Sequence, residues 1–260
     1  MRTLTLGGAE TGVMEAGDSG PRLILSHCTM AHSGAWKPLL AELGAVQATA
    51  LDLPGHGASE MDATRGPQRQ GADAVLEVLG EGPAHLIGHS FGGRVVLRAA
   101  LDRPEAVASL TLIEPMMMHL LAEDDPVRLA EERDMQAYAE AETEAEAARA
   151  FMEMWGGGQP WEALPERQRA YATERIGFVA DSAEDVMGDP PGQMTLDDIA
   201  GLDCPVTVIA GARTRASALS ICERIAGRLS DRPHIVAGAG HMVPISHPAE
   251  VAAILRERLG

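Results

Sequence analysis

One serine between glycines constrains this chain more than any other feature, because an apolar run leads into it and a helical pattern follows it. The run Ala84–Ile87 is typical of a buried parallel strand, and Gly88-His89-Ser90-Phe91-Gly92 comes directly after it. Glycines carry no Cβ, so a strand and a helix can fold back tightly across such a turn and present the serine hydroxyl. Ser90 is therefore our candidate nucleophile. The alternative, a glycine-rich turn with an incidental serine, is disfavoured by the strand and helix patterns on either side.

Strand and helix patterns alternate along most of the chain. Residues 2–16 predict an opening antiparallel hairpin. Runs typical of buried strands lie at 22–27, 46–53, 84–87, 107–115, 205–211 and 234–237. Helical patterns lie at about 36–43, 72–79, 91–103, 218–229 and 248–259. This alternation predicts an α/β fold with a mostly parallel, doubly wound sheet that has helices on both faces.

The alternation stops between about residues 116 and 195. The segment 123–155 is rich in alanine and glutamate, and 165–179 again has helical spacing. We therefore expect a helical cap at 116–195, inserted into a core formed by 1–115 and 196–260. The cap contains six of the eight aromatic residues and eight of the thirteen methionines. Most of these side chains are expected to form the cap's own core.

The methionines that open this segment, Met116-Met117-Met118, are interpreted differently. They leave the strand that follows the elbow helix, which directs them toward the serine. Flexible thioethers suit a pocket that adapts to apolar acyl groups. We therefore expect Met116 and Met117 to line a pocket that prefers apolar groups over charged ones.

The charge of the chain restricts its partners. Its formal net charge is -17 at pH 7, so nucleic acid and anionic membrane surfaces are expected to repel it. Three widely spaced cysteines offer neither a disulfide framework nor a C-x-x-C pair, which suits a reducing cytoplasm. The first residues lack the apolar core of a signal peptide, and no run approaches the roughly 18 apolar residues of a membrane helix. We expect a cytoplasmic protein without metal or cofactor, and the sequence leaves monomer and homodimer open.

The residues that follow the predicted strands resemble the motifs of the α/β-hydrolase fold superfamily. They are His27-Cys28-Thr29, Asp52-Leu53-Pro54-Gly55-His56-Gly57, Gly88-His89-Ser90-Phe91-Gly92-Gly93 and Gly240-His241. The resemblance covers essentially the whole chain and is weakest in the cap. It implies that Ser90 attacks an acyl carbon and that His241 takes and returns the proton. Among the nine histidines, His241 comes first after the last strand, in the chain order of the family, and His247 looks like the start of the last helix.

The resemblance also implies an oxyanion hole of two backbone N–H groups. One is that of Phe91, directly after the nucleophile. The other is assigned to Thr29, in a loop where the family usually has His-Gly and an apolar residue. Cys28 stands here in the glycine position, and we interpret it as a small packed side chain rather than a second nucleophile. We expect His27, Cys28 and Met242 to line the substrate pocket.

The position of the triad acid departs from the family pattern. Most members carry it in a Gly-x-x-Asp turn after the strand that follows the cap, and the matching turn here has Thr214, which cannot carry the charge. Glu114 ends the strand after the elbow helix, where some family members place a glutamate. We therefore predict that Glu114 orients His241. A Ser-His dyad, in which Glu114 merely ends its strand, is the alternative.

Together with the resemblance, these residues predict a serine hydrolase that cleaves a carboxylic ester, or a related acyl bond, of a small to medium apolar substrate. A dehalogenase or an epoxide hydrolase of this fold would carry aspartate at position 90. A thioesterase, a C–C bond hydrolase and an acyltransferase stay open, because they use the same groups. A different class also stays open, given the departures at Cys28 and Thr214: a ligand-binding protein that keeps the fold and has lost turnover.

Overall fold

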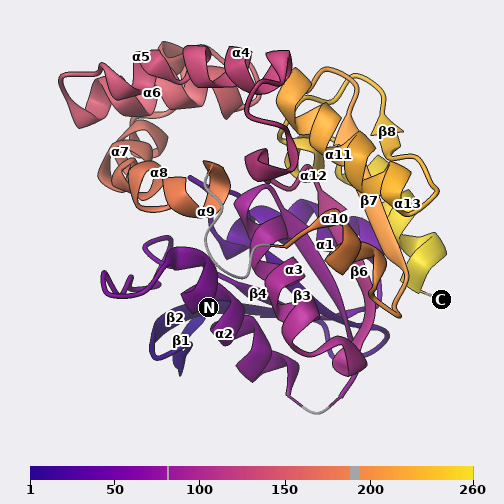
Figure 1. Cartoon of the computed structure of the whole chain (residues 1–260). Coiled ribbons are helices and arrows are strands. Elements are labelled where there is room, and N and C mark those ends of the chain that lie inside the picture. Colours follow the sequence, from indigo (N-terminus) through magenta and orange to yellow (C-terminus); the bar gives the residue numbers. More distant parts are fainter. Residues whose placement is uncertain (81, 188–193, 260) are drawn as a thin grey trace.

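An eight-stranded sheet forms the centre of the computed structural model, which describes residues 1–80, 82–187 and 194–259 (Figure 1). The strands are β1 (Arg2–Leu6), β2 (Ala9–Ala16), β3 (Arg22–Ser26), β4 (Gln47–Leu51), β5 (Ala84–His89), β6 (Val107–Ile113), β7 (Val206–Gly211) and β8 (His234–Val236). Their order in the sheet is β1-β2-β4-β3-β5-β6-β7-β8. β1 and β2 form the predicted antiparallel hairpin, β2 is antiparallel to β4, and the other neighbours are parallel.

Helices cover both faces of the sheet, because successive side chains of each strand point to opposite faces. In β3, Leu23 and Leu25 join one buried cluster and Ile24 joins the other. The first cluster is covered by α1 (Lys37–Leu43) and α13 (Pro248–Leu259); the second is covered by α2 (Pro67–Leu79), α3 (Phe91–Asp102) and α11 (Ala216–Arg228). Two short helices, α10 (Leu196–Ala200) and α12 (Val243–Ser246), precede β7 and α13. The predicted doubly wound α/β arrangement is confirmed.

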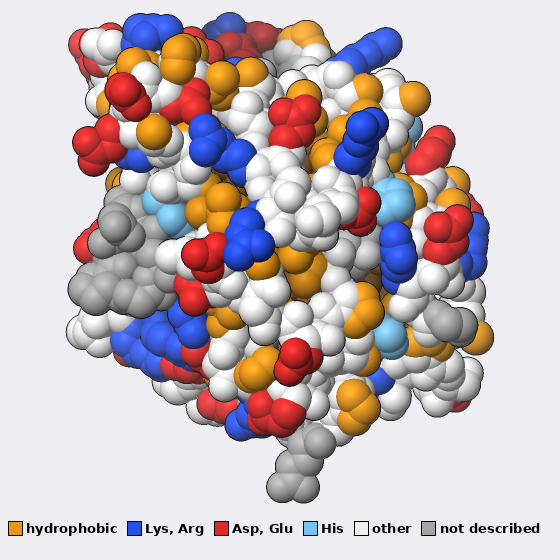
Figure 2. All heavy atoms as spheres, turned by 45° about the vertical axis from the view of Figure 1, so that its right-hand side comes forward, with side chains coloured by type: hydrophobic (Ala, Val, Ile, Leu, Met, Phe, Trp, Pro, Cys, Tyr) orange, Lys and Arg blue, Asp and Glu red, His pale blue; other side chains and the backbone are white. Residues whose placement is uncertain are grey.

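Acidic and basic side chains are interspersed on the face of the molecule shown in Figure 2, with apolar side chains scattered between them. Several of the arginines pair with carboxylates. Arg228 lies 2.8 Å from Asp197, and Arg224 lies 3.0 Å from Asp125. None of the described helices is both long and apolar enough to cross a membrane.

Between β6 and α10, the described residues form a group of helices over the carboxyl ends of the parallel strands (Figure 1). They are α4 (Pro126–Asp134), α5 (Gln136–Ala139), α6 (Glu144–Trp155), α7 (Glu166–Arg175), α8 (Gly177–Asp181) and α9 (Ala183–Met187). The helical pattern predicted over 165–179 is split at Ile176, between α7 and α8. Residues 188–193, near the end of the predicted cap, lie outside the described residues.

The cap has only a small core of its own. Its fully buried members are Ala148, Ala172 and Ile176. Tyr138, Phe151 and Trp161 pack against them, as expected. Phe178 instead joins the main core, where its ring packs edge-on against His56 and Phe91 at centroid distances of 4.5 and 5.0 Å. The expectation that the cap residues form their own core is therefore met only in part, because the short helices arch over a cavity.

Candidate active site

Ser90 lies on a sharp turn between β5 and α3. Its φ and ψ angles are 55° and -119°, a conformation that non-glycine residues rarely adopt and that the surroundings must enforce. The Ser90 N–H donates to the carbonyl of Ile113 over 2.9 Å, and the Ser90 carbonyl accepts from the Gly93 N–H over 2.9 Å. The backbone of the turn is thus held on both sides. Ser90 lines a cavity, although it is only 5% exposed.

Gly92 explains how this turn meets the neighbouring loop. A Cβ on this residue would lie 2.3 Å from the carbonyl oxygen of Ser26 and 2.4 Å from that of His27. Only glycine therefore lets the first turn of α3 approach the end of β3 so closely. The contact brings the loop that carries Thr29 next to Ser90, and both residues line the same cavity.

A buried carboxylate holds the imidazole of His241. Glu114 Oε2 lies 2.6 Å from His241 Nδ1, and the side chains are 0% and 7% exposed. The same carboxylate accepts from the Gly211 N–H over 2.7 Å and from the Thr214 hydroxyl over 2.5 Å. Three donors therefore satisfy it in its charged form. The structure places Glu114 against His241, as the sequence predicts, and Thr214 beside it as a donor.

This contact fixes the orientation of the imidazole. A carboxylate accepts hydrogen bonds, so Nδ1 of His241 carries the proton and Nε2 is left free to act as a base. The ring of Trp155 packs edge-on against it, with 4.6 Å between the centroids.

His89 is a residue whose place in the site the sequence did not reveal. Its Nε2 donates to the carbonyl oxygen of His241 over 2.8 Å, so it fixes the backbone that carries the base. Burial holds the pKa of His89 well below its ordinary value, which keeps the ring neutral. The only signal in the sequence is its position directly before Ser90.

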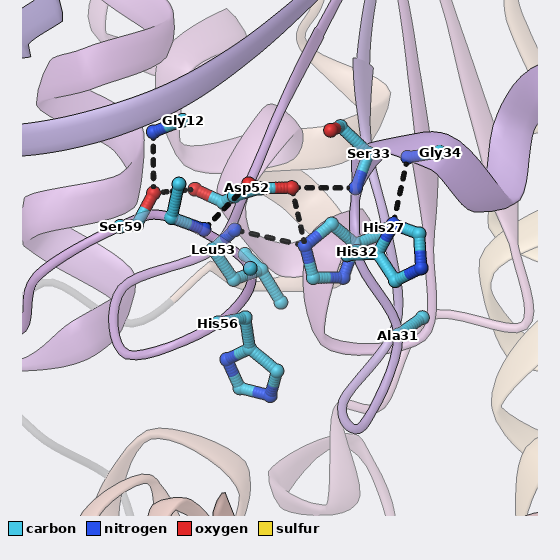
Figure 3. Close-up of polar contacts among 12 residues, drawn as sticks. Gly12, His27, Ala31, His32, Ser33, Gly34, Asp52, Leu53, His56 and Ser59 are labelled. Atoms are coloured by element: carbon cyan, nitrogen blue, oxygen red, sulfur yellow. Dashed lines mark hydrogen bonds and ion pairs between the residues drawn. The ribbon is translucent and has the colours of Figure 1, made fainter. Parts of the chain in front are cut away.

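His27 fixes the peptide bond that precedes Thr29. Its Nε2 accepts from the Leu53 N–H over 2.9 Å (Figure 3), so Nδ1 carries the proton and donates to the Cys28 carbonyl over 2.8 Å. In a trans peptide the C=O and N–H point in opposite directions, so the Thr29 N–H is turned away from His27. Burial lowers the pKa of His27 to about 3, and the ring stays neutral. His27 is not among the described residues that line the cavity, so its predicted place in the pocket is wrong; it lies behind the loop.

A second neutral histidine holds the same loop. His56 Nε2 accepts from the Met30 N–H over 3.1 Å, and its Nδ1 donates to the Pro54 carbonyl over 3.0 Å. Met30 has a φ of 64°, so this bond stabilises a left-handed backbone at a non-glycine residue. Burial lowers the pKa of His56 to about 3.

Asp52 joins the loop after β3 to the loop after β4. Its Oδ1 accepts from the Ser33 N–H over 2.6 Å (Figure 3), and its Oδ2 accepts from the Ala58 N–H over 2.9 Å. His27 Nε2 also lies 4.0 Å from Asp52 Oδ1. That proximity is not an ion pair, because the Leu53 N–H occupies the lone pair of this nitrogen and the ring is neutral.

Ser90, His241 and Phe91 line a cavity of about 670 Å³ beneath the cap helices, a size typical of small-molecule sites. Seven methionines contribute to its wall: Met30, Met116, Met118, Met135, Met152, Met187 and Met242. Met117, which was expected in the pocket, is instead fully buried in the main core, and Met118 takes its place. Met118 opens a short 3-10 helix, Met118–Leu120, and its side chain contacts both the main core and the cavity.

The acidic side chains of the cavity wall are neutralised by arginines. Arg215 Nε lies 2.8 Å from Glu131 Oε2, which also accepts from the Ser217 hydroxyl over 2.7 Å. Glu132 accepts from Arg128 over 2.9 Å.

Across residues 1–80, 82–187 and 194–259, no three His, Cys, Asp or Glu side chains are grouped so that they could hold a metal ion.

Cys28 contributes a packed thiol to the cavity wall. Burial raises its pKa to about 12, so the thiol keeps its proton and is a poor nucleophile. Its Sγ lies 4.0 Å from Sδ of Met242, and both residues line the cavity, as predicted.

Known proteins identify the family of this chain. The sequence profile of the alpha/beta hydrolase family matches residues 23–254. The chain belongs to this family. Lipase LipV of Mycobacterium tuberculosis is 28% identical to this alpha/beta hydrolase over an alignment 273 positions long, which covers 95% of this chain and 97% of LipV.

Solved structures share the fold. A hydrolase from Pseudomonas aeruginosa PA01 superposes with a TM-score of 0.75 at 26% identity, covering 100% of this alpha/beta hydrolase and 98% of the other chain. The meta-cleavage product hydrolase of Pseudomonas fluorescens IP01 gives a TM-score of 0.74 at 19% identity, with 99% and 97% covered. The second likeness concerns the fold alone.

We expect this alpha/beta hydrolase to lose stability between pH 6 and pH 5. His27 and His56 have a pKa of about 3 in the folded protein and about 6.5 in an unfolded chain. In this interval the unfolded chain therefore binds protons that the folded protein does not, and stability falls as the pH falls. Each histidine should lower the free energy of unfolding by about 1 kcal/mol between pH 6 and pH 5.

Urea unfolding followed by tryptophan fluorescence at closely spaced pH values measures this decline. In His56→Gln the amide oxygen can still accept a hydrogen bond from the Met30 N–H. The free energy of unfolding of this variant should fall by about 1 kcal/mol less between pH 6 and pH 5 than that of the wild type. A free energy of unfolding that stays constant from pH 6 to pH 5 would contradict the neutral burial of these rings.

Proposed function

We propose that this alpha/beta hydrolase is a serine hydrolase that cleaves carboxylic esters of small to medium apolar substrates through an acyl-enzyme. The observation that carries the proposal is the 2.6 Å contact between His241 Nδ1 and Glu114, beside the cavity that Ser90 and His241 line together. The relative LipV is named a lipase, which supports ester hydrolysis in general terms.

In the first half-reaction, Ser90 Oγ forms a bond to the acyl carbon and passes its proton to His241 Nε2. Glu114 stabilises the resulting imidazolium through Nδ1. The N–H groups of Phe91 and Thr29 are the proposed donors to the oxyanion of the tetrahedral adduct. When this adduct collapses, the bond to the alkoxy oxygen breaks and Nε2 returns the proton to the leaving alcohol.

In the second half-reaction, water replaces the alcohol. Its oxygen bonds to the acyl carbon while one of its protons passes to His241 Nε2. Collapse of the second adduct breaks the bond to Ser90 Oγ, which takes the proton back. The products are a carboxylic acid and the free serine.

The cavity wall supports an uncharged, apolar substrate. Thioethers and aromatic rings make up much of the wall, and the carboxylates of Glu131 and Glu132 are already paired with Arg215 and Arg128. Among the wall residues that the structure describes, a charged substrate group would find no unpaired lysine, arginine, aspartate or glutamate, so the loss of its hydration there would be costly. Methionine side chains can repack around acyl groups of different shapes.

We expect a fluorophosphonate probe to label the wild-type protein at one site per chain, because the probe reacts with an activated serine. Intact-protein mass spectrometry measures the stoichiometry. Labelling should vanish in Ser90→Ala and persist in Ser246→Ala, which removes an exposed serine on α12. A folded, monodisperse wild type that does not react would contradict the proposal and favour a ligand-binding protein.

A series of p-nitrophenyl esters tests the substrate class. We expect kcat/KM to be higher for neutral aliphatic acyl chains than for an anionic acyl chain of similar length, since the described residues of the wall offer apolar contacts and include no lysine or arginine. If kcat/KM were highest for the monoester of a dicarboxylic acid, this account of the cavity would be wrong. Thioesters of the same acyl groups, run in parallel, separate an esterase from a thioesterase.

We expect Glu114→Gln to lower kcat by about two to four orders of magnitude while KM stays nearly unchanged. The amide oxygen would keep the bond from the Gly211 N–H and present its NH2 group to His241. Nδ1 would then have to accept, the proton would move to Nε2, and the base would be lost. Steady-state kinetics on a variant with a native circular dichroism spectrum measure the effect.

Thr214→Val is the matched control, since it removes one donor from the same carboxylate and leaves the charge. Its kcat should fall by about tenfold, the equivalent of one hydrogen bond. A folded Glu114→Gln variant with near wild-type turnover would remove Glu114 from the triad and leave the Ser-His dyad.

A further inference from the structure

A cap residue contacts the loop that carries Thr29. The hydroxyl of Tyr171, on α7, donates to the Ala31 carbonyl over 2.8 Å and accepts from the Gly57 N–H over 2.9 Å. A phenol has one proton, and both its donor and acceptor capacities are used here. The cap is therefore bonded at a single atom to the loop after β3 and to the loop after β4.

The Ala31 carbonyl belongs to a closed turn. The Ala31 N–H donates over 3.1 Å to the Cys28 carbonyl, the group that His27 also holds. The core fixes this turn from one side through His27 and His56. Tyr171 holds the Ala31 carbonyl, the last of the turn, from the cap side. The Thr29 N–H therefore belongs to a turn that is fixed from both sides.

The ring of Tyr171 is itself anchored. The guanidinium carbon of Arg175 lies 3.9 Å from the ring centroid, and the ring of His32 packs edge-on at 6.1 Å. Burial raises the pKa of Tyr171, so the hydroxyl keeps the proton that it donates. The hydroxyl is thus held in place from the cap side before any substrate binds.

We propose that Tyr171 is a positioning residue that aligns the Thr29 N–H with the oxyanion only while α7 is docked on the core. This inference rests on the proposed function, because an oxyanion forms only if an acyl bond is attacked. Tyr171 is outside the described residues that line the cavity, so it acts through the loop and not on the substrate.

Other contacts would keep the cap in place without Tyr171. Glu131 of α4 is paired with Arg215 of the core, and Asp185 of α9 accepts from the Gln68 N–H over 3.1 Å. Neither contact touches the turn at residues 28–31. Removal of the Tyr171 hydroxyl should therefore loosen the turn and leave the cap docked.

The test compares Tyr171→Phe with Arg224→Ala. The second variant removes another cap-to-core contact, the 3.0 Å pair of Arg224 and Asp125, which lies outside the cavity wall and the turn. We expect Tyr171→Phe to lower kcat by about 10- to 100-fold with KM within about twofold, since complete loss of an oxyanion donor costs about 10²- to 10³-fold. Arg224→Ala should keep wild-type kcat.

Two further measurements separate positioning from a structural role. A trifluoromethyl ketone forms a tetrahedral adduct with the serine that carries an oxyanion, and its affinity should fall in Tyr171→Phe by the same factor as kcat/KM. Hydrogen exchange over residues 27–34 should become faster in Tyr171→Phe but not in Arg224→Ala. A tether that served only to stabilise the fold would lower Tm without moving the ketone affinity.

Wild-type kcat and ketone affinity in Tyr171→Phe would overturn this inference alone. A wild type that neither reacts with fluorophosphonate nor hydrolyses esters would overturn the proposed function and this inference with it. If Tyr171→Phe does not fold, Arg175→Ala decides the question, because it frees the ring and leaves the hydroxyl. The kcat of Arg175→Ala should also fall, by a smaller factor than the one expected for Tyr171→Phe. An unchanged kcat would overturn the inference.

Discussion

The carboxylate of Glu114 is the interaction on which the arrangement of the site depends. It is fully buried, and its donors come from three places: the imidazole of His241, the Gly211 N–H and the Thr214 hydroxyl. A buried carboxylate that loses its partners costs several kcal/mol. The ends of β6 and β7 and the loop after β8 must therefore converge on one point. The φ of 44° at Glu114 shows that the backbone is held in an unusual conformation to meet this demand.

Three buried, neutral histidines fix the backbone around this point through hydrogen bonds. A neutral imidazole has one donor and one acceptor, and His27 and His56 each use both on the backbone. His89 bonds the carbonyl of His241. The low pKa values that follow from burial keep these roles constant at neutral pH. His241 differs because its ring meets a carboxylate on one side and the cavity on the other.

The sequence predicts the parts of this structure that have local causes. The strands, the helices beside them and the turn at Ser90 follow from apolar periodicity and glycine placement over a few residues. Glu114 could be proposed because Thr214 stands where a carboxylate was expected. The contacts of His27 and Tyr171 could not be proposed, since their partners lie 26 and 140 residues away in the chain and leave no periodic signal. The sequence also does not show that Met118, and not Met117, lines the cavity, because the local backbone conformation determines which of the two side chains faces it.

The place of Glu114 also determines how the cap could be exchanged between proteins. Glu114 directly follows β6, and Met116, two residues later, is already part of the cavity wall. The charged partner of the imidazole thus stays on the core side of a junction placed after Pro115. Arg215, one residue beyond Thr214, is free to bind Glu131 of the cap. A chimaera that takes a foreign cap between this junction and β7 would keep the carboxylate and the imidazole of the core, and a carboxylate opposite Arg215 would restore one of the contacts that seat the helices.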